Sequence, residues 1–332
     1  MKDVLPAMMI GLRVLCFAGT YALALGCDLT RFFLQTRRGW HLSVALTALG
    51  WLVQGAYLAN LTIQTHHIPV TTLFESLLVL SWILTAIDLY LTLHARKPTA
   101  IGLFILPTVI AILMIAEFAR STSTWNWSQW NDRVRFWGIT HGFFLLLGAA
   151  ATCVAFVSGL MYMKQSNKLK HKKPPRFGVV LPSLEQSERW NRWAITIAFP
   201  LLTFGLLIGM ILNVAARGEA GRPIAWTDPK ILSASAMWFV FAVLIHARFR
   251  PAMRGRRVVA LTMIAFAFLV FTWSITLILP SEHDGPKSRD KESRNSHSLN
   301  RLKTDVDSFA FIFRSSDDSK ILVESIVQGG RS

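Results

Sequence analysis

The sequence consists mainly of long apolar stretches separated by short polar segments. Apolar residues neither alternate nor recur on one helical face within these stretches, so the stretches lack the polar side that a soluble helix or strand needs. Eight stretches are long enough to cross a hydrocarbon core of about 30 Å as helices. They lie at residues 4–26, 40–61, 69–93, 99–119, 137–163, 193–215, 231–247 and 258–280. The pattern predicts an all-α integral membrane bundle of about eight transmembrane helices.

Composition agrees with this fold class, since 52% of the 332 residues are hydrophobic and only 16% are charged, with a mean hydropathy of +0.41. These values exclude a soluble enzyme, a nucleic-acid-binding domain and a disordered chain. The net charge of +16 resides wholly in residues 1–280, because residues 281–332 carry nine basic and nine acidic side chains. We therefore expect a transmembrane domain over 1–280 and a disordered, extracytoplasmic polar tail over 281–332.

Basic residues in the loops predict the orientation of the helices. The loops 27–39, 94–98, 164–192 and 248–257 together hold eighteen Lys and Arg, whereas the N-terminus and the alternate loops hold seven. Because cytoplasmic loops carry the excess of basic residues, the first set is assigned to the cytoplasm and both termini to the outside. We expect a multi-pass protein of the bacterial cytoplasmic (inner) membrane.

Ionisable residues at membrane depth require partners. Arg13 and Glu75 are expected at similar depths, so an ion pair between them is the favoured interpretation. A proton path through Glu75 would need further acids along a line, and Asp88 is the one available.

Histidines fall into two layers in the predicted topology. His66, His67, His141 and His283 belong to the outer face, whereas His41, His94 and His246 lie near the inner face. Any single histidine is more often a hydrogen-bonded interfacial residue than a ligand, but two layers favour a metal or haem site. Haem is favoured over zinc, because the histidines lack close ligand spacing and have no nearby cysteine or carboxylate companions.

Tryptophans are concentrated in the outer loops. Four of them, at positions 125, 127, 130 and 137, lie within thirteen residues that also hold two arginines, and Trp226 is in the next outer loop. An aromatic belt explains any single tryptophan. The group as a whole favours a porphyrin, because indoles can stack on the ring and guanidinium groups can bind its propionates.

The segment Trp226-Thr227-Asp228-Pro229-Lys230, followed by Trp238 and by His246-Ala247-Arg248, resembles the tryptophan-rich motif of the CcsA-type cytochrome c assembly proteins. Two further segments are similar to that family: His67-Ile68-Pro69 with Glu75-Ser76-Leu77, and the turn Arg254-Gly255-Arg256-Arg257. His141 and His283 stand where the family has external histidines. The resemblance covers about residues 40–283.

The resemblance implies roles for these residues and for partners. His141 and His283 would be the external axial ligands of haem iron, His246 the membrane-embedded axial ligand, and Trp226 with Asp228 part of the haem-binding loop. The cofactor would be b-type haem, held non-covalently in transit. The implied partners are apocytochrome c, which receives the haem, and a second membrane subunit of the CcsB/ResB kind.

The motif is incomplete, because Ala225 and Thr227 stand where tryptophans are expected. The chain in this respect resembles the HemX-like branch of the same superfamily. Whether it acts as a cytochrome c haem lyase subunit therefore stays open. The alternatives are a non-catalytic scaffold or regulator of haem metabolism, and a small-molecule transporter with helices broken near Pro107 or Pro200.

Overall fold

The computed structural model describes residues 4–34, 38–65, 68–70, 72–94, 101–119, 132–170, 182–215, 227–249 and 255–278. These residues form eight α-helices and no strands. The helices are α1 (Val4–Leu34), α2 (Arg38–Thr65), α3 (Leu73–Leu93), α4 (Gly102–Ala119), α5 (Asp132–Lys170), α6 (Leu184–Ala215), α7 (Pro229–Phe249) and α8 (Arg256–Ile278). All of them belong to the first of two units of the chain, Met1–Ser281. The second unit, Glu282–Ser332, and the disorder predicted for the tail lie outside the described residues.

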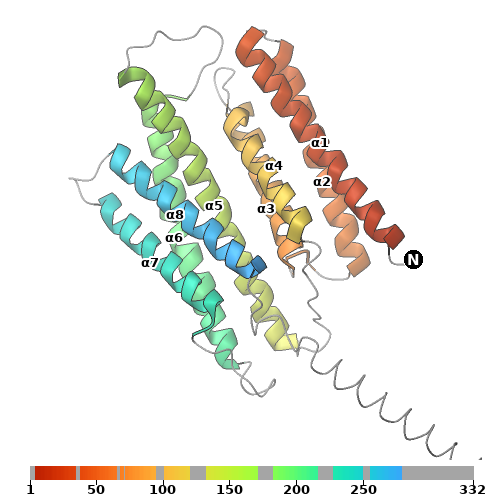
Figure 1. The fold of residues 1–332 in the computed structure, drawn as a ribbon, viewed down its shortest axis with the longest axis vertical. Helices are drawn as coiled ribbons and strands as arrows, with labels where there is room; N and C mark the ends of the chain where they lie inside the picture. Colours follow the sequence, from red (N-terminus) through yellow and green to blue (C-terminus); the bar gives the residue numbers. More distant parts are fainter. Residues whose placement is uncertain are drawn as a thin grey trace, which may run out of the picture. The chain divides into compact units, whose positions relative to one another are not determined.

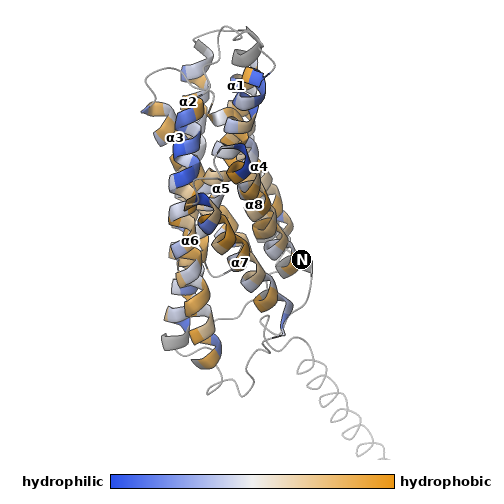
Figure 2. Cartoon of the chain, turned by 90° about the vertical axis from the view of Figure 1, so that its left-hand side faces the viewer, coloured by the Kyte–Doolittle hydropathy of each residue, from blue (hydrophilic) through white to orange (hydrophobic). Residues whose placement is uncertain are grey.

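Seven of the described helices, α2 to α8, are long and apolar enough to cross a membrane. The side chains described in α1 add an apolar stretch at Val14–Thr30. Hydrophobic residues, in orange, recur along the helices, with hydrophilic residues in blue between them (Figure 2). The predicted all-α, multi-pass membrane fold is therefore confirmed.

Two helices continue well beyond the apolar stretches that predicted them. The loop predicted at 164–192 contributes the last turns of α5, to Lys170, and the first turns of α6, from Leu184. Lysine, glutamine and glutamate are good helix formers, so hydrophilic sequence extends a helix that hydrophobicity alone would end earlier. Ser183 begins α6 by accepting a hydrogen bond from the backbone N–H of Gln186 at 3.1 Å.

The helices form two groups of four (Figure 1). In the first group, α1 contacts α2, α2 contacts α3, α3 contacts α4, and α4 returns to α1. The second group repeats this order, with α5 on α6, α6 on α7, α7 on α8, and α8 back on α5. Helix α5 also contacts α3 and α4 and so joins the two groups. Each group is thus a ring of antiparallel neighbours, although the sequence has no internal repeat.

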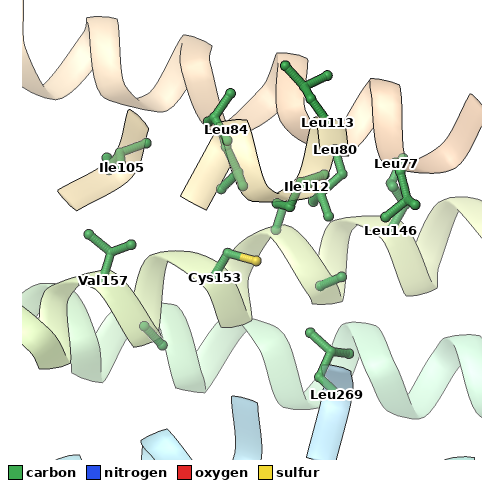
Figure 3. Packing of buried hydrophobic residues seen from close by; sticks show 14 of the residues in the cluster. Leu77, Leu80, Leu84, Ile105, Ile112, Leu113, Leu146, Cys153, Val157 and Leu269 are labelled. Atoms are coloured by element: carbon green, nitrogen blue, oxygen red, sulfur yellow. The ribbon is translucent and has the colours of Figure 1, made fainter. Parts of the chain in front are cut away.

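The apolar core passes through both groups (Figure 3). Leucines of α3, including Leu77 and Leu84, and Ile112 of α4 approach α5 from one side, where Cys153 is buried at 2% exposure. Leu269 of α8 approaches α5 from the other side. Burial on both sides explains why α5 is apolar all round in its middle.

Helix α3 begins with a capping box. The backbone N–H of Glu75 donates to Thr72 Oγ1 at 3.2 Å, and the backbone N–H of Thr72 donates to Glu75 Oε2 at 3.3 Å. Glu75 thus has a structural role at the helix start. The Arg13 side chain of the expected ion pair lies outside the described residues, so that pairing stays a prediction.

Helices α4 and α6 are continuous through Pro107 and Pro200. The breaks that the transporter interpretation requires are therefore absent from these two helices, within the described residues.

Candidate functional site

His141 lies on α5, in the third turn of the helix, and its side chain is half-buried against α6. The imidazole Nδ1 is 2.7 Å from the backbone carbonyl oxygen of Gly205. A carbonyl can only accept, so Nδ1 carries the hydrogen and donates it. In the neutral imidazole, Nε2 then keeps its lone pair, and a histidine fixed in this way is a typical metal ligand.

Two glycines of α6 make room for α5: Gly209 faces the His141 ring, and Gly205 faces Leu145. A Cβ atom at Gly209 would lie 2.6 Å from His141 Cε1 and 2.9 Å from Nδ1, closer than real contacts allow. A Cβ atom at Gly205 would lie 2.6 Å from Leu145 Cδ2. The glycines are four residues apart, the spacing that lets membrane helices approach closely. The two glycines form the surface of α6 that receives α5.

Aromatic side chains surround the exposed edge of this contact. Trp137 is one turn before His141 on α5 and is 40% exposed. Its ring is 5.9 Å from that of Phe136, and on the other side Phe144 pairs with Phe204 of α6 at 5.8 Å. Since residues i and i+4 share a helix face, Trp137 and His141 present an indole and an imidazole together. Trp125, Trp127 and Trp130 of the predicted group lie outside the described residues.

Asp228 directly precedes α7, and its backbone carbonyl accepts the first helical hydrogen bond, from Leu232 N–H, at 3.0 Å. Its side chain is buried, with 6% exposed. Pro229 occupies the first helical position, where its missing N–H is harmless. Neighbouring helices are antiparallel, so Asp228 lies at the end of the second group where α5 begins, as does His141. Trp226 lies outside the described residues.

His246 lies near the opposite end of the second group, and its side chain is exposed. Two residues later, the guanidinium of Arg248 is 6% exposed and donates to the backbone carbonyl of Glu188 at 3.3 Å. Glu188 and Gly205 are separated by roughly 25 Å along α6 at 1.5 Å per residue. The structure therefore does not bring His246 and His141 together, and the third proposed ligand, His283, lies outside the described residues.

Two other inner-layer histidines, His41 and His94, are exposed at helix ends. The His41 ring is 4.7 Å from that of Trp40, and His94 ends α3 with Nδ1 2.9 Å from the carbonyl of Tyr90. Within the described ranges, no three His, Cys, Asp or Glu side chains gather as a metal-binding group. Such a closed site is what structural zinc requires. The imidazole of His141, fixed in one tautomer beside an exposed indole, fits the single axial ligand that haem iron takes from a helix.

The sequence could not reveal the partner of His141, because a backbone carbonyl has no residue identity. The available signal was the pair of glycines four residues apart in α6. It becomes informative only when α5 is known to lie against it.

The sequence model of the family described as Cytochrome C assembly protein matches residues 70–279. Protein HemX of Brevibacillus brevis is 25% identical over 250 residues, which are 73% of this chain and 89% of that protein. Protein HemX of Bacillus subtilis (strain 168) is 23% identical over 237 residues, 71% of this chain and 83% of that protein. Cytochrome c biogenesis protein CcsA of Trieres chinensis is 25% identical over 232 residues, 61% of this chain and 73% of that protein. No solved structure matches.

The matched segment includes His141, Asp228 and His246 and extends over more than half of the sequence. The resemblance identified from the residues around Asp228 and His246 is thereby confirmed, and the chain belongs to the cytochrome c assembly protein family.

Proposed function

We propose that this protein binds haem at the outer face of the membrane and presents it for attachment to apocytochrome c. The observation that carries the proposal is the bond from His141 Nδ1 to the carbonyl of Gly205, which leaves Nε2 as the ligand nitrogen. Membership of the cytochrome c assembly family supports the same function. The cofactor is b-type haem in transit, held without a covalent bond to this chain.

The residues of the outer end have separate roles in this proposal. His141 is the axial ligand, Gly205 orients its ring, and the exposed indole of Trp137 offers a surface for the porphyrin. Asp228 fixes the start of α7 at the same end, and Trp226 precedes it in the haem-binding loop. When bound, haem supplies the iron for His141 and the vinyl groups that are joined to the cytochrome thiols.

The two remaining ligands in this proposal lie at different levels of the membrane. His283 would be the second ligand of haem iron at the outer face, and His246 would hold haem at the inner level. Because His246 is exposed at the surface of α7, a second membrane subunit of the CcsB/ResB kind can supply the facing ligand. The protein resides in the bacterial cytoplasmic membrane with both termini outside, so that His141 faces the compartment where apocytochrome c is matured.

The test is the absorption spectrum of the full-length protein, purified in detergent from cells supplied with haem. The wild type gives a Soret band with six-coordinate, low-spin iron. His141→Gly loses or shifts this band, and added imidazole restores it, because the small molecule replaces the missing ligand. Thr140→Ala is the matched control, since Thr140 is the neighbour of His141 in sequence and its hydroxyl donates to the carbonyl of Phe136 in its own helix. An unchanged spectrum in His141→Gly contradicts the proposal.

A second candidate is a non-catalytic scaffold or regulator of haem metabolism. It is favoured by the similarity to protein HemX over 89% of that protein's length and by the incomplete tryptophan motif. Under this function the purified wild type is colourless, and deletion of the gene leaves covalent haem on c-type cytochromes. Under the first function, deletion removes it.

A further inference from the structure

A small polar cavity lies inside the first group of helices, far from the site of His141 in sequence and on different helices. It encloses about 10 Å³ and is lined chiefly by Asp28 of α1, Ser43 and Thr47 of α2, Asp88 and Thr92 of α3, and Gly102 of α4. This volume holds one water-sized particle. All four helices of the group thus contribute residues to the wall of one small cavity.

Two carboxylates converge on this cavity. Asp28 is 8% exposed and Asp88 is 3% exposed. Their Oδ2 atoms lie 2.6 Å and 3.5 Å from the position that a Cβ atom of Gly102 would occupy. A glycine at the start of α4 therefore leaves the space that both carboxylates face.

One oxygen of this pair lacks a hydrogen-bond partner among the described residues. That oxygen is Asp88 Oδ1, which is buried. A buried carboxylate oxygen is costly to leave unsatisfied, particularly at membrane depth. Asp88 lines the cavity, so a group held in the cavity can satisfy this oxygen.

The hydroxyl groups in the wall also present lone pairs. Thr47 Oγ1 donates its hydrogen to the backbone carbonyl of Ser43 at 2.9 Å, and Ser43 Oγ donates to that of Ala24 at 3.3 Å. With their hydrogens committed to backbone, these oxygens can only accept from the cavity. The donors left in this wall are Trp40 Nε1 and the hydroxyl of Thr92, which have no hydrogen-bond partner among the described residues. The oxygens of the two carboxylates and of the Ser43 and Thr47 hydroxyls outnumber these donors, so the wall attracts a cation.

We propose that this cavity binds a single sodium ion, held by Asp88 and Asp28 with hydroxyl oxygens of Ser43 and Thr47. Magnesium keeps several of its waters, for which a space of about 10 Å³ has no room, and calcium takes six to eight oxygens, more than four side chains supply with one oxygen each. Within the described residues, fewer than three acidic, histidine or cysteine side chains gather at any point, which also disfavours a multivalent metal. The sodium ion joins α1, α2 and α3 beside the start of α4.

The site is tested on the full-length protein in detergent at constant pH by its thermal unfolding midpoint. Sodium chloride is titrated against choline chloride at constant ionic strength. Because sodium binds the folded state, the wild-type midpoint rises by about 3 °C or more and then saturates. Asp88→Asn, which keeps the shape and removes the charge, abolishes the sodium-specific rise. Glu185→Gln is the control, because it removes the charge of an exposed acid on α6 and keeps the full response.

A direct measurement of sodium binding tests the site even if the Asp88 variant misfolds. Wild-type protein retains one ²²Na⁺ per chain in equilibrium binding, and Thr47→Val, which removes one ligand oxygen, weakens this retention severalfold. Equal midpoints in sodium and choline, a wild-type response in Asp88→Asn, or no retained ²²Na⁺ overturns the proposal. Haem binding by His141 is a separate property, so the loss of either function leaves the other measurable.

Discussion

His141 and Gly205 are joined by a 2.7 Å hydrogen bond from an imidazole to a main-chain carbonyl of the neighbouring helix. The carbonyl of Gly205 is also the normal acceptor for the backbone N–H of Gly209, one turn on. The imidazole therefore shares an acceptor that the helix supplies whatever side chains it carries. Backbone geometry therefore fixes the orientation of the ring. A substitution that fills the space above the glycines would displace it.

Gly209→Ala is expected to displace the His141 ring, since the new Cβ would lie 2.6 Å from Cε1. Overpacking of this kind costs about 1–3 kcal/mol. We expect a lower free energy of unfolding in detergent and an altered Soret band in the same sample. Gly19→Ala is the matched control, because no atom lies within 4 Å of its Cβ position, and it should be neutral or slightly stabilising. Equal spectra for the two variants would contradict this role of Gly209.

Tyr21→Phe is expected to destabilise the first helix group. Tyr21 Oη donates to Gln54 Oε1 at 2.7 Å, and Gln54 Nε2 donates to Ser81 Oγ at 2.7 Å and to the carbonyl of Leu78 at 3.1 Å. Gln54 is fully buried, so its Oε1 would be left without this donor at a cost of about 1–3 kcal/mol. Denaturant titration measures the loss. Tyr90→Phe, at an exposed tyrosine, should change stability by less than about 0.5 kcal/mol.

Arg248→Met is expected to loosen the contact between the start of α6 and the end of α7. The buried guanidinium bonds to the carbonyl of Glu188 at 3.3 Å and lies 3.9 Å from its carboxylate. Removing it costs about 1–3 kcal/mol through the lost charge-assisted bond. The exposed pair Arg189–Glu185 provides the comparison: Arg189→Met should cost less than about 0.5 kcal/mol. A similar loss in both variants would show that burial of Arg248 is unimportant.

Thr72→Ala removes one half of the capping box at the start of α3. Thr72 Oγ1 then no longer accepts from Glu75 N–H, and an N-cap of this kind contributes about 1 kcal/mol. Thr72→Ser, which keeps the hydroxyl, should retain most of the stability. Unfolding free energies of the two variants separate the capping bond from the general effect of a substitution here.

The membrane fold could be predicted because about twenty consecutive apolar residues have few alternatives to a spanning helix. The ends of the helices were harder to predict from the sequence. Lys170 and Leu184 are helical because hydrophilic residues with good helix propensity follow an apolar core, and hydropathy does not report that. The closure of α1–α4 and of α5–α8 into two rings depends on contacts between distant segments, which one sequence does not encode in a visible pattern.

The candidate site could likewise be predicted from the sequence only in part. His141 could be identified from its layer and from a family resemblance, but its acceptor, the carbonyl of Gly205, carries no side-chain signature. Asp88 was noticed as a deep acid, whereas Asp28 fell in a predicted loop because α1 extends past the apolar stretch to Leu34. Their convergence beside Gly102 could be found only from three-dimensional structure.

The glycine surface of α6 has an evolutionary consequence. A chain that retains an imidazole at position 141 must leave position 209 without a side chain, whereas a chain that has lost the imidazole is released from this requirement. Substitutions at the two positions should therefore be correlated among homologues. A homologue that gained alanine at position 209 would lose the space for the imidazole ring before any substitution of His141 itself.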